Sequence, residues 1–382
     1  MMSSRDRVMA ALNHREPDRV PIDIGGGYST SISVEGYERL KQYLGITKPS
    51  EALDDIFRIA RVDTEVMRRL GSDCFPVVCG SPSNWTPPPS APDQFIDLWG
   101  VKWKRVQYSE GCYYMELHES PLARARLKDL DDYPWPDPSD PGFTDGLREE
   151  VKTIYHETDY ALMADSGFKS IWEQAFFLRG YQQLLLDLVR NPDFVSAFFS
   201  KILEINLVAT ARFLDEVGHY IHVVRTGDDL AAQADLIMSP AMYRRILKPA
   251  YKRYIDLVRS KTKAKIFFHS CGNITRLIDE LIDTGVDIIN PVQVSAIKDT
   301  AALKAKFGER ITFWGGIDTQ HVLPRGSVDE VRSEVRQRIR DLGPGGGFVV
   351  AAVHNIQADV PPQNIVAMAE AVQEFGAYPL KA

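Results

Sequence analysis

The sequence is poor in cysteine. Its four cysteines, widely separated in 382 residues, are too few for a disulfide framework, so we expect reduced thiols and a cytoplasmic protein. Runs of basic residues are missing, and the formal net charge of −7 argues against a nucleic-acid partner. We see neither an apolar run of the ~20 residues that a membrane span needs nor the apolar core of a signal peptide. A membrane partner is therefore not expected.

A dinucleotide fingerprint is also missing. The strand expected at residues 19–24 runs into Gly25, Gly26 and Gly27, but the spacing G-x-G-x-x-G does not occur there. What the sequence does contain is a globular composition, with 44% hydrophobic and 25% charged residues. A chain of this length and composition can bury a large core, and we expect a single domain over residues 1–382.

The apolar pattern predicts strands that alternate with helices. Residues 3–13 are typical of an amphipathic N-terminal helix, and residues 97–103 and 112–118 alternate with period two around 109–111, which predicts a β-hairpin excursion. Apolar strands are expected at residues 19–24, 74–79, 160–164, 221–225, 265–269, 286–290, 311–315 and 348–353. Eight strands with intervening helices favour an α/β fold, a (β/α)8 TIM barrel, over a doubly wound open sheet.

Polar residues gather directly after these strands. The carboxyl ends of the strands of a barrel meet at one rim, which is where barrel enzymes build their active sites, so we expect these residues to share one site. They are Asp165, Asp228, Asp229, Asn290, Gln293 and Asp318. For any single aspartate the alternative is a helix N-cap, so the argument depends on their accumulation.

The strongest chemical signal is His269-Ser-Cys271 at the end of the strand expected at 265–269. Side chains at positions i and i+2 of an extended chain share a face, so His269 and Cys271 can bind one metal ion. His354 follows the last strand and can supply a third zinc ligand, which leaves a fourth position open as in catalytic zinc sites. The alternative is that all three are ordinary buried residues.

Together these motifs resemble the uroporphyrinogen decarboxylase superfamily, and within it the zinc-dependent corrinoid methyltransferases. The segments that carry the resemblance, over almost the whole chain, are 15–21 (REPDRVP), 70–73 (LGSD), 227–230 (GDDL), 239–240 (SP), 269–272 (HSCG), 315–318 (GGID) and 360–364 (VPPQN). Those methyltransferases hold zinc with H-x-C and a distant cysteine that stands ten residues before an asparagine. Here His354 stands ten residues before Asn364. The resemblance therefore implies zinc bound by His269, Cys271 and His354, with one cysteine exchanged for histidine.

The resemblance implies an enzyme that moves a methyl group between a small substrate and a corrinoid (cobalamin) cofactor on a partner protein. A His-Cys-His set leaves zinc with more positive charge than a His-Cys-Cys set and favours a departing oxygen, so we expect a methoxylated substrate, as in O-demethylation. We expect Asp228 and Asp229 to be catalytic. The residues expected to bind substrate are Tyr28, Asp165, Asn290, Gln293 and Asp318.

Three alternatives stay open: methyl transfer from methylcobalamin to a thiol, a decarboxylase-like lyase, and a scaffold that binds a corrinoid protein without chemistry. Porphyrinogen decarboxylases carry an arginine-rich R-Q-A-G-R segment after the first strand, which grips the carboxylates of their substrate. This chain has IDIGGGY at residues 22–28 instead. Without bidentate arginines a polyanionic substrate loses its charge-matched partners, so porphyrin chemistry is disfavoured.

Overall fold

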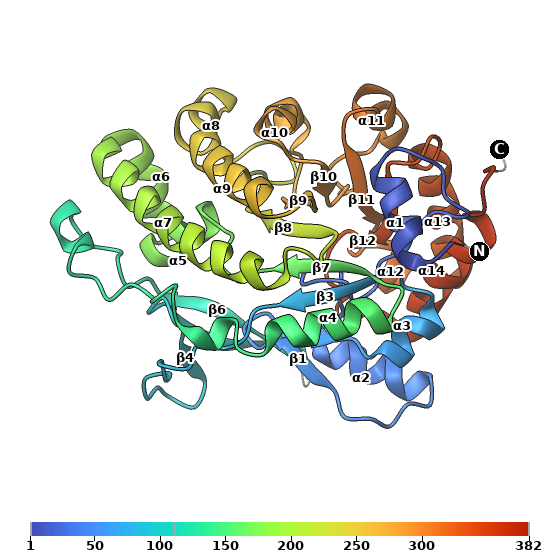
Figure 1. Cartoon of the computed structure of the whole chain (residues 1–382), viewed down its shortest axis with the longest axis horizontal. Helices are drawn as coiled ribbons and strands as arrows, with labels where there is room; N and C mark the ends of the chain where they lie inside the picture. Colours follow the sequence, from blue (N-terminus) through green and yellow to red (C-terminus); the bar gives the residue numbers. More distant parts are fainter. Residues whose placement is uncertain (1, 110–111, 381–382) are drawn as a thin grey trace.

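The computed structural model describes residues 2–109 and 112–380. Its central feature is a parallel sheet whose strands follow one another in chain order, with helices on its outer side (Figure 1). The strands are β3 (Cys74–Val78), β7 (Ala161–Asp165), β8 (Val223–Gly227), β9 (Lys265–His269), β10 (Ile288–Asn290), β11 (Thr312–Ile317) and β12 (Phe348–Ala352). The sheet curls as in a TIM barrel, which confirms the predicted fold class.

The first predicted strand, at residues 19–24, is not a regular strand. It forms one parallel bridge, between Ile22 and Val350 of β12, and on its other side the carbonyl of Ile22 accepts a hydrogen bond of 2.8 Å from the amide of Asp73. The neighbouring hydrogen bonds on that side involve side chains. The Asp73 carboxylate accepts the amide of Ile22, and the Ser72 hydroxyl accepts the amide of Ile24. The segment thus occupies the eighth position, between β12 and β3, without a backbone ladder.

Alternation along the strands separates two apolar cores. Met163, Val223, Phe267, Ile288 and Trp314 belong to a buried cluster inside the barrel. The side chains between them, one residue along each strand, pack in a larger cluster with the surrounding helices. This period of two fixes which strand residues can face the mouth of the barrel.

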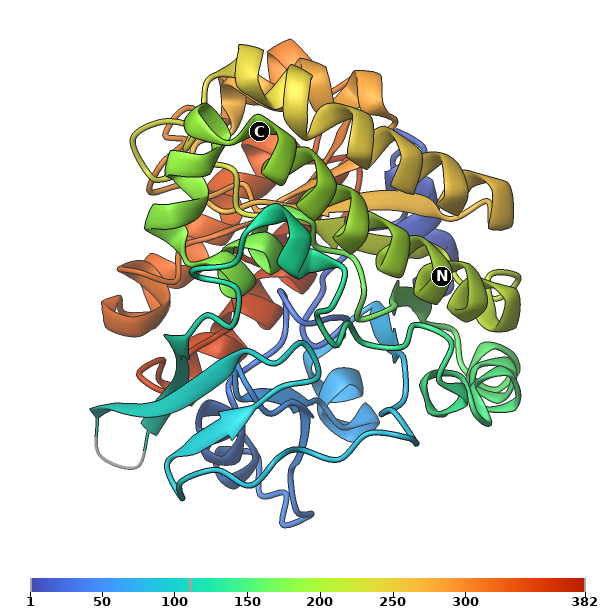
Figure 2. The same ribbon diagram turned by 90° about the vertical axis from the view of Figure 1, so that its left-hand side faces the viewer.

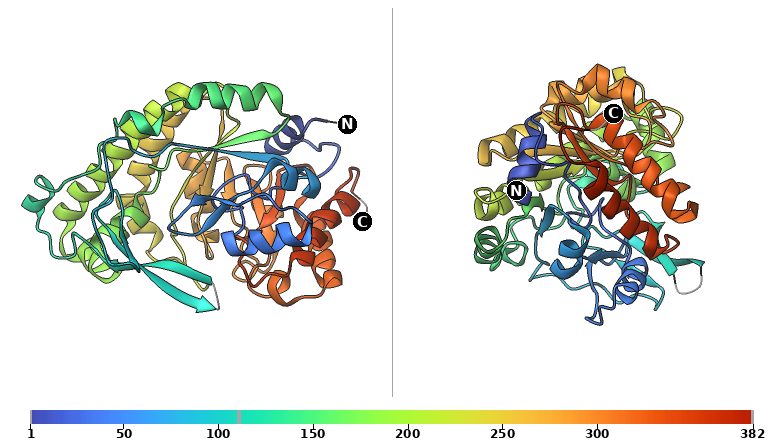
Figure 3. Two further views of the ribbon diagram at one scale, coloured as in Figure 1. Left: turned by 90° about the horizontal axis from the view of Figure 1, so that it is seen from below. Right: turned by 90° about the vertical axis from the view of Figure 1, so that its right-hand side faces the viewer.

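Helices connect the strands and cover the barrel. They are α1 (Ser4–Leu12), α2 (Val34–Tyr43), α3 (Thr64–Leu70), α4 (Leu147–Glu157), α5 (Trp172–Arg179), α6 (Tyr181–Arg190), α7 (Pro192–Val217), α8 (Pro240–Ile246), α9 (Lys248–Lys261), α10 (Ile278–Thr284), α11 (Thr300–Phe307), α12 (Val322–Arg325), α13 (Val328–Leu342) and α14 (Pro362–Phe375). Both ends of the chain lie at the same end of the molecule (Figure 3).

Helix α1 confirms the predicted N-terminal helix. The Ser3 hydroxyl caps it by accepting the amide of Asp6. Val8 and Leu12 pack into the inner cluster beside Ala161, at the start of β7. The helix therefore covers the amino-terminal end of the barrel, and the carboxyl ends of the strands remain available for a site.

The hairpin excursion is present, with one boundary wrong. The antiparallel strands are β4 (Gln94–Ile96), β5 (Lys102–Ser109) and β6 (Cys112–Glu119), which form a separate ribbon (Figure 2); β1 (Glu51–Asp54) and β2 (Ile59–Arg61) form another. Residues 97–101 are not a strand, because the Asp97 carboxylate accepts the amides of Trp99 and Val101 and folds the chain into a turn. Of the predicted turn 109–111, residues 110 and 111 lie outside the described part of the chain.

Helix α7 contradicts the expectation that no stretch has the composition of a membrane span. Among the described residues it is the one helix long and apolar enough, and 56% of its most apolar window is buried. Phe198, Ile202 and Phe213 lie in the outer core, and α7 packs against α4, α6 and α9. Packing in the barrel's outer layer accounts for its apolar composition.

Candidate metal centre and its pocket

Four neighbouring strands change from apolar to polar inward side chains towards their carboxyl ends. Inward residues Met163, Val223, Phe267 and Ile288 are each followed two residues later by a polar side chain. The four polar residues are Asp165 on β7, Arg225 on β8, His269 on β9 and Asn290 on β10. The strand pairing places His269 beside Asn290, with Arg225 one inward position deeper, beside Phe267.

Asn290 fixes the tautomer of His269. Its amide nitrogen donates to the carbonyl of Trp314 at 3.2 Å, so its amide oxygen faces His269 Nδ1, 2.6 Å away. Nδ1 must therefore carry the proton, and the lone pair on Nε2 stays free. Burial lowers the pKa of His269 to about 4, which keeps the ring neutral at neutral pH.

Cys271 lies just beyond β9, in a loop that two side chains hold in place. The Asp229 carboxylate accepts the amide of Cys271 at 2.7 Å, and the amide oxygen of Gln293 accepts the amide of Gly272 at 2.7 Å. The sulfur of Cys271 lies 3.5 Å from His269 Nε2. The prediction that these two side chains meet is confirmed, although the strand itself ends at His269.

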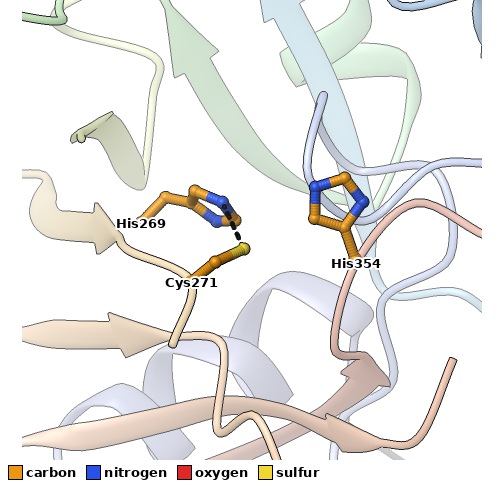
Figure 4. A group of neighbouring side chains, drawn as sticks. All are labelled: His269, Cys271 and His354. Atoms are coloured by element: carbon orange, nitrogen blue, oxygen red, sulfur yellow. Dashed lines mark hydrogen bonds between the residues drawn. The ribbon is translucent and has the colours of Figure 1, made fainter. Parts of the chain in front are cut away.

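His354 completes the cluster from the loop after β12. One ligand atom each from His269, Cys271 and His354 lies within 4.8 Å of the other two. The His354 ring faces the other two side chains (Figure 4), and the centroids of the two imidazoles are 6.0 Å apart. His354 is exposed, whereas His269 is buried, so the cluster opens towards solvent on the His354 side.

The donor set fits zinc. Zinc prefers sulfur and imidazole nitrogen, and tetrahedral geometry places an N and an S ligand about 3.6 Å apart, close to the 3.5 Å between His269 Nε2 and Cys271 Sγ. Burial also raises the pKa of the Cys271 thiol, so a metal has to displace its proton.

The two predicted catalytic aspartates point in different directions. Asp228 is fully buried and caps α5, because its carboxylate accepts the amides of Ile171 at 2.9 Å and Glu173 at 2.8 Å and the hydroxyl of Tyr251. Asp228 therefore satisfies amides at the start of α5 from a distant loop, while the N-cap residue of that helix is Ile171. Asp229 instead lies beside the cluster of His269, Cys271 and His354, with its carboxylate 3.7 Å from His269 Nε2.

A cavity of about 460 Å³ lies at the carboxyl ends of the strands. His269, His354 and Asp229 line it, and so does Tyr28. Its volume is within the range of small-molecule sites, and its position is the one expected for a barrel enzyme.

The sequence matches one known protein family over more than half of its length. The family model described as uroporphyrinogen decarboxylase matches residues 113–375. The chain belongs to the uroporphyrinogen decarboxylase family. The resemblance read from the motifs is thereby confirmed.

Two curated relatives illustrate the range of the matches. Methylcobamide:CoM methyltransferase MtaA of Methanosarcina barkeri is 26% identical over 209 residues, which is 52% of this chain and 57% of that protein. Uroporphyrinogen decarboxylase of Methylococcus capsulatus is 27% identical over 130 residues, which is 32% of this chain and 35% of that protein. These matches span less than two thirds of either relative.

A solved structure supports the fold over the full length. The methyltransferase from Methanosarcina mazei superposes with a TM-score of 0.64 and covers 98% of this chain and 99% of that chain, at 16% sequence identity. At that identity the likeness shows a shared fold.

Within this family fold, the residues predicted to bind substrate lie in three different settings. Tyr28 lines the cavity, and Asp165 forms ion pairs with two cavity residues. Asn290 and Gln293 instead position His269 and the Cys271 loop. Asp318 turns the chain after β11, since its carboxylate accepts the amide of Gln320, and it does not line the cavity.

Sequence reasoning missed several cavity residues. Lys169, Glu173 and Arg225 line it, together with tryptophans from the region around the hairpin. Burial, then the neighbouring Asp229 and Asp228, raise the pKa of Glu173 to about 8, so its carboxyl is protonated at neutral pH. The inward alternation along β8 was a signal that could have identified Arg225. Lys169 and Glu173 lie beyond a strand end, where no periodicity marks them.

Proposed function

We propose that this protein is a zinc-dependent methyltransferase that moves a methyl group between a small, methoxylated substrate and a corrinoid cofactor carried by a partner protein. The observation that carries the proposal is the cluster of His269, Cys271 and His354 at the edge of the 460 Å³ cavity. Membership of the uroporphyrinogen decarboxylase family and similarity to a methylcobamide:CoM methyltransferase support it.

His269, Cys271 and His354 would hold the zinc ion, which when bound supplies a Lewis acid that polarises an ether oxygen or lowers the pKa of a thiol. Asn290 keeps Nε2 of His269 free for this purpose. Glu173 carries a proton at neutral pH that its carboxyl can donate to the oxygen that loses its methyl group.

The donor set favours an oxygen leaving group. Two imidazoles and one thiolate carry one negative charge, whereas one imidazole and two thiolates carry two. The lower ligand charge leaves a harder site that stabilises developing charge on oxygen better. On this ground we prefer a methoxylated donor.

Methyl transfer from methylcobalamin to a thiol is the second candidate. The observation that favours it is the similarity to methylcobamide:CoM methyltransferase, whose name states a thiol acceptor, CoM. The same three ligands would serve both reactions, so substrate assays have to separate them.

The proposal includes the setting of the reaction. We treat residues 1–382 as one domain that works in the cytoplasm with a corrinoid-binding protein, and without nucleic acid or membrane. The four cysteines, all free, and the net charge of −7 support this setting.

Metal analysis combined with a methyl-transfer assay tests the proposal. We expect about one zinc ion per chain, lost in His269→Ala, Cys271→Ala and His354→Ala but retained in the controls Cys79→Ala and His321→Ala. Wild-type protein should transfer methyl from a methoxylated compound to cob(I)alamin. Stoichiometric zinc in all three ligand variants, or decarboxylation by zinc-free protein, would contradict the proposal.

A further inference from the structure

One buried carboxylate joins two loops beside the cavity. Asp140 precedes the short 3-10 helix Pro141–Phe143 and is only 3% exposed. One of its carboxylate oxygens accepts the amide of Ser83 at 2.8 Å, the hydroxyl of Ser83 at 2.7 Å and the amide of Gly142 at 2.8 Å. The other oxygen accepts the amide of Asn84 at 2.8 Å. Asp140 thus holds the loop after β3 from a position 57 residues further along the chain than Ser83.

Two glycines let these loops approach each other. A Cβ added at Gly80 would lie 2.3 Å from the Gly142 carbonyl oxygen, and a Cβ added at Gly142 would lie 2.4 Å from the Ser81 carbonyl oxygen. A side chain at either position would therefore displace backbone. The Gly80 amide also donates to the Phe143 carbonyl at 2.9 Å. This close backbone contact brings Asp140 within reach of two successive amides, so both loops encode the junction.

The segment that follows the junction, residues 81–90, reaches the cavity, and we call it the strap. Its indole side chain, Trp85, lines the cavity. Among the described residues, none forms a hydrogen bond with residues 85–89, three of which are prolines without an amide proton. The next hydrogen bond is that of the Ser90 hydroxyl, which donates to a backbone carbonyl at 2.8 Å. The bonds to Asp140 are therefore the last fixed point of the strap before Trp85.

The aromatic wall of the cavity has a fixed part and a free part. Phe168 packs edge-on against Phe143 at a centroid distance of 5.0 Å, and Trp99 packs against Phe168 at 6.0 Å. Phe168 and Trp99 are buried and line the cavity. Trp85 lines it too but is only half-buried, and within the described part of the chain its indole has no ring contact and donates no hydrogen bond. With so few contacts, the position of Trp85 depends on the backbone that leads to it.

We propose that the strap closes Trp85 over a ligand in the cavity, and that Asp140 is the positioning residue that fixes the base of the strap. Asp140 itself does not line the cavity, so it acts through Trp85. Closure of an aromatic ring excludes water from a site and adds contact area to a bound ligand, as the lids of other enzymes do. The inference rests on the proposed function, because it takes this cavity as the substrate site.

Fluorine NMR of protein labelled with 5-fluorotryptophan tests the strap without any turnover. The six tryptophans give one resonance each, and the resonance that is lost in Trp85→Phe is that of Trp85. In zinc-loaded wild-type protein this signal should differ from that of free 5-fluorotryptophan. It should shift further on addition of anisole or of 2-mercaptoethanol, an ether and a thiol that serve as probes for the two candidate functions.

Replacing Asp140 should release Trp85 alone. In Asp140→Ala the Trp85 signal should move towards that of free 5-fluorotryptophan, while the other signals stay in place and report an intact fold. Asp140→Asn should move it less, because its amide oxygen can still accept three of the four hydrogen bonds. Asp137→Ala is the matched control, since Asp137 also accepts the amide and the hydroxyl of a serine, at 2.8 Å and 2.6 Å, but is exposed.

Methyl-transfer kinetics separate positioning from general destabilisation. Trp85→Ala and Asp140→Ala should each raise KM for the small substrate by about tenfold and leave kcat nearly unchanged, because both remove the same contact with bound substrate. In the double variant the two effects should not add. Additive effects would show that Asp140 acts on the cavity by a route other than Trp85, and would overturn its assigned role.

Wild-type protein alone can overturn the inference, so no variant has to fold. A Trp85 signal that coincides with that of free 5-fluorotryptophan, or that neither probe shifts, means that the strap does not close on the cavity. A Trp85 signal that stays unchanged in Asp140→Ala, with the fold intact, overturns the role of Asp140. The expected shifts without any methyl transfer would support the strap and count against the proposed function alone.

Discussion

The amide oxygen of Asn290 lies 2.6 Å from Nδ1 of His269, and the amide nitrogen of Asn290 is tied to the Trp314 carbonyl. The orientation of the amide is therefore set by a neighbouring strand, and it sets the histidine tautomer in turn. A buried asparagine with both polar ends satisfied has little freedom to rotate. This relationship makes Asn290 a positioning residue for His269, one of the three residues proposed to hold zinc.

Replacing Asn290 should weaken zinc binding without removing a ligand. We expect Asn290→Ala to lower zinc affinity by about 10- to 100-fold, because His269 loses the acceptor that orients its ring, whereas Asn290→Asp should retain most of the affinity. Competition with a zinc chelator measures this. Asn364→Ala is the control, since Asn364 is also a buried asparagine bonded to backbone carbonyls but lies at the start of α14. Equal losses in the two alanine variants would mean that general destabilisation explains the effect.

The sequence predicts the chemistry at the ends of β9 and β12 because local patterns encode it. An apolar strand followed by H-x-C places His269 and Cys271 together, and the rim of a barrel brings His354 to them. A strand end, however, does not tell which way a side chain turns. Asp228 and Asp318 follow strands as predicted, yet the structure uses both carboxylates to cap or turn the backbone.

Contacts between distant segments explain what the sequence did not predict. Trp103 reaches the cavity because the hairpin folds back over α5, and hydrogen bonding of Tyr114 to Gln357 ties that hairpin to the loop after β12. The segment at residues 19–24 forms a single bridge at Ile22 instead of a strand, because the Asp73 side chain accepts a backbone amide that a neighbouring strand would otherwise bind. No periodicity within one segment encodes such pairings.

Glu334 should make stability fall as pH rises. Its carboxyl oxygen accepts the amide of Asp318, and burial raises its pKa from the ordinary 4.5 to about 7. A raised carboxyl pKa means that the folded state favours the protonated form, so stability is full below pH 4.5 and is lost as pH rises through about 7. Glu334→Gln should therefore gain up to about 3 kcal/mol relative to wild type between pH 5 and pH 8.

Urea unfolding at the two pH values measures the effect of Glu334→Gln. Glu330→Gln, on the same helix α13, is the matched control: Ser327 donates to the Glu330 carboxylate and lowers its pKa, so Glu330 is ionised at both pH values and that variant should show little change in relative stability between them. A Glu334→Gln difference that stays constant with pH would show that Glu334 is ionised throughout this range.

Glu173 should be needed for methyl transfer from an oxygen but not for zinc binding. Glu173→Gln keeps the shape of the side chain and loses the proton, so the rate from a methoxylated donor should fall by about 10²- to 10⁴-fold with zinc content unchanged. The wild-type rate should fall above about pH 8, where the carboxyl ionises, while the residual rate of the variant should not. Loss of zinc in Glu173→Gln would instead assign Glu173 to the metal.

His354→Cys tests whether the ligand charge selects the substrate. The variant should still bind one zinc ion per chain, because a thiolate is a good zinc ligand. A second thiolate makes the ligand set more negative and weakens its stabilisation of charge on oxygen, so methyl-ether cleavage should slow, while methylation of a thiol should be maintained or accelerated. The assays are methyl transfer to cob(I)alamin from methoxylated compounds and transfer from methylcobalamin to a small thiol, for both proteins at equal zinc occupancy.

Equal loss of both activities in His354→Cys would mean that the exchange merely distorts the site. A wild-type protein that methylates thiols and leaves every methoxylated donor untouched would show that the ligand charge does not choose the substrate, and that the second candidate function is the correct one.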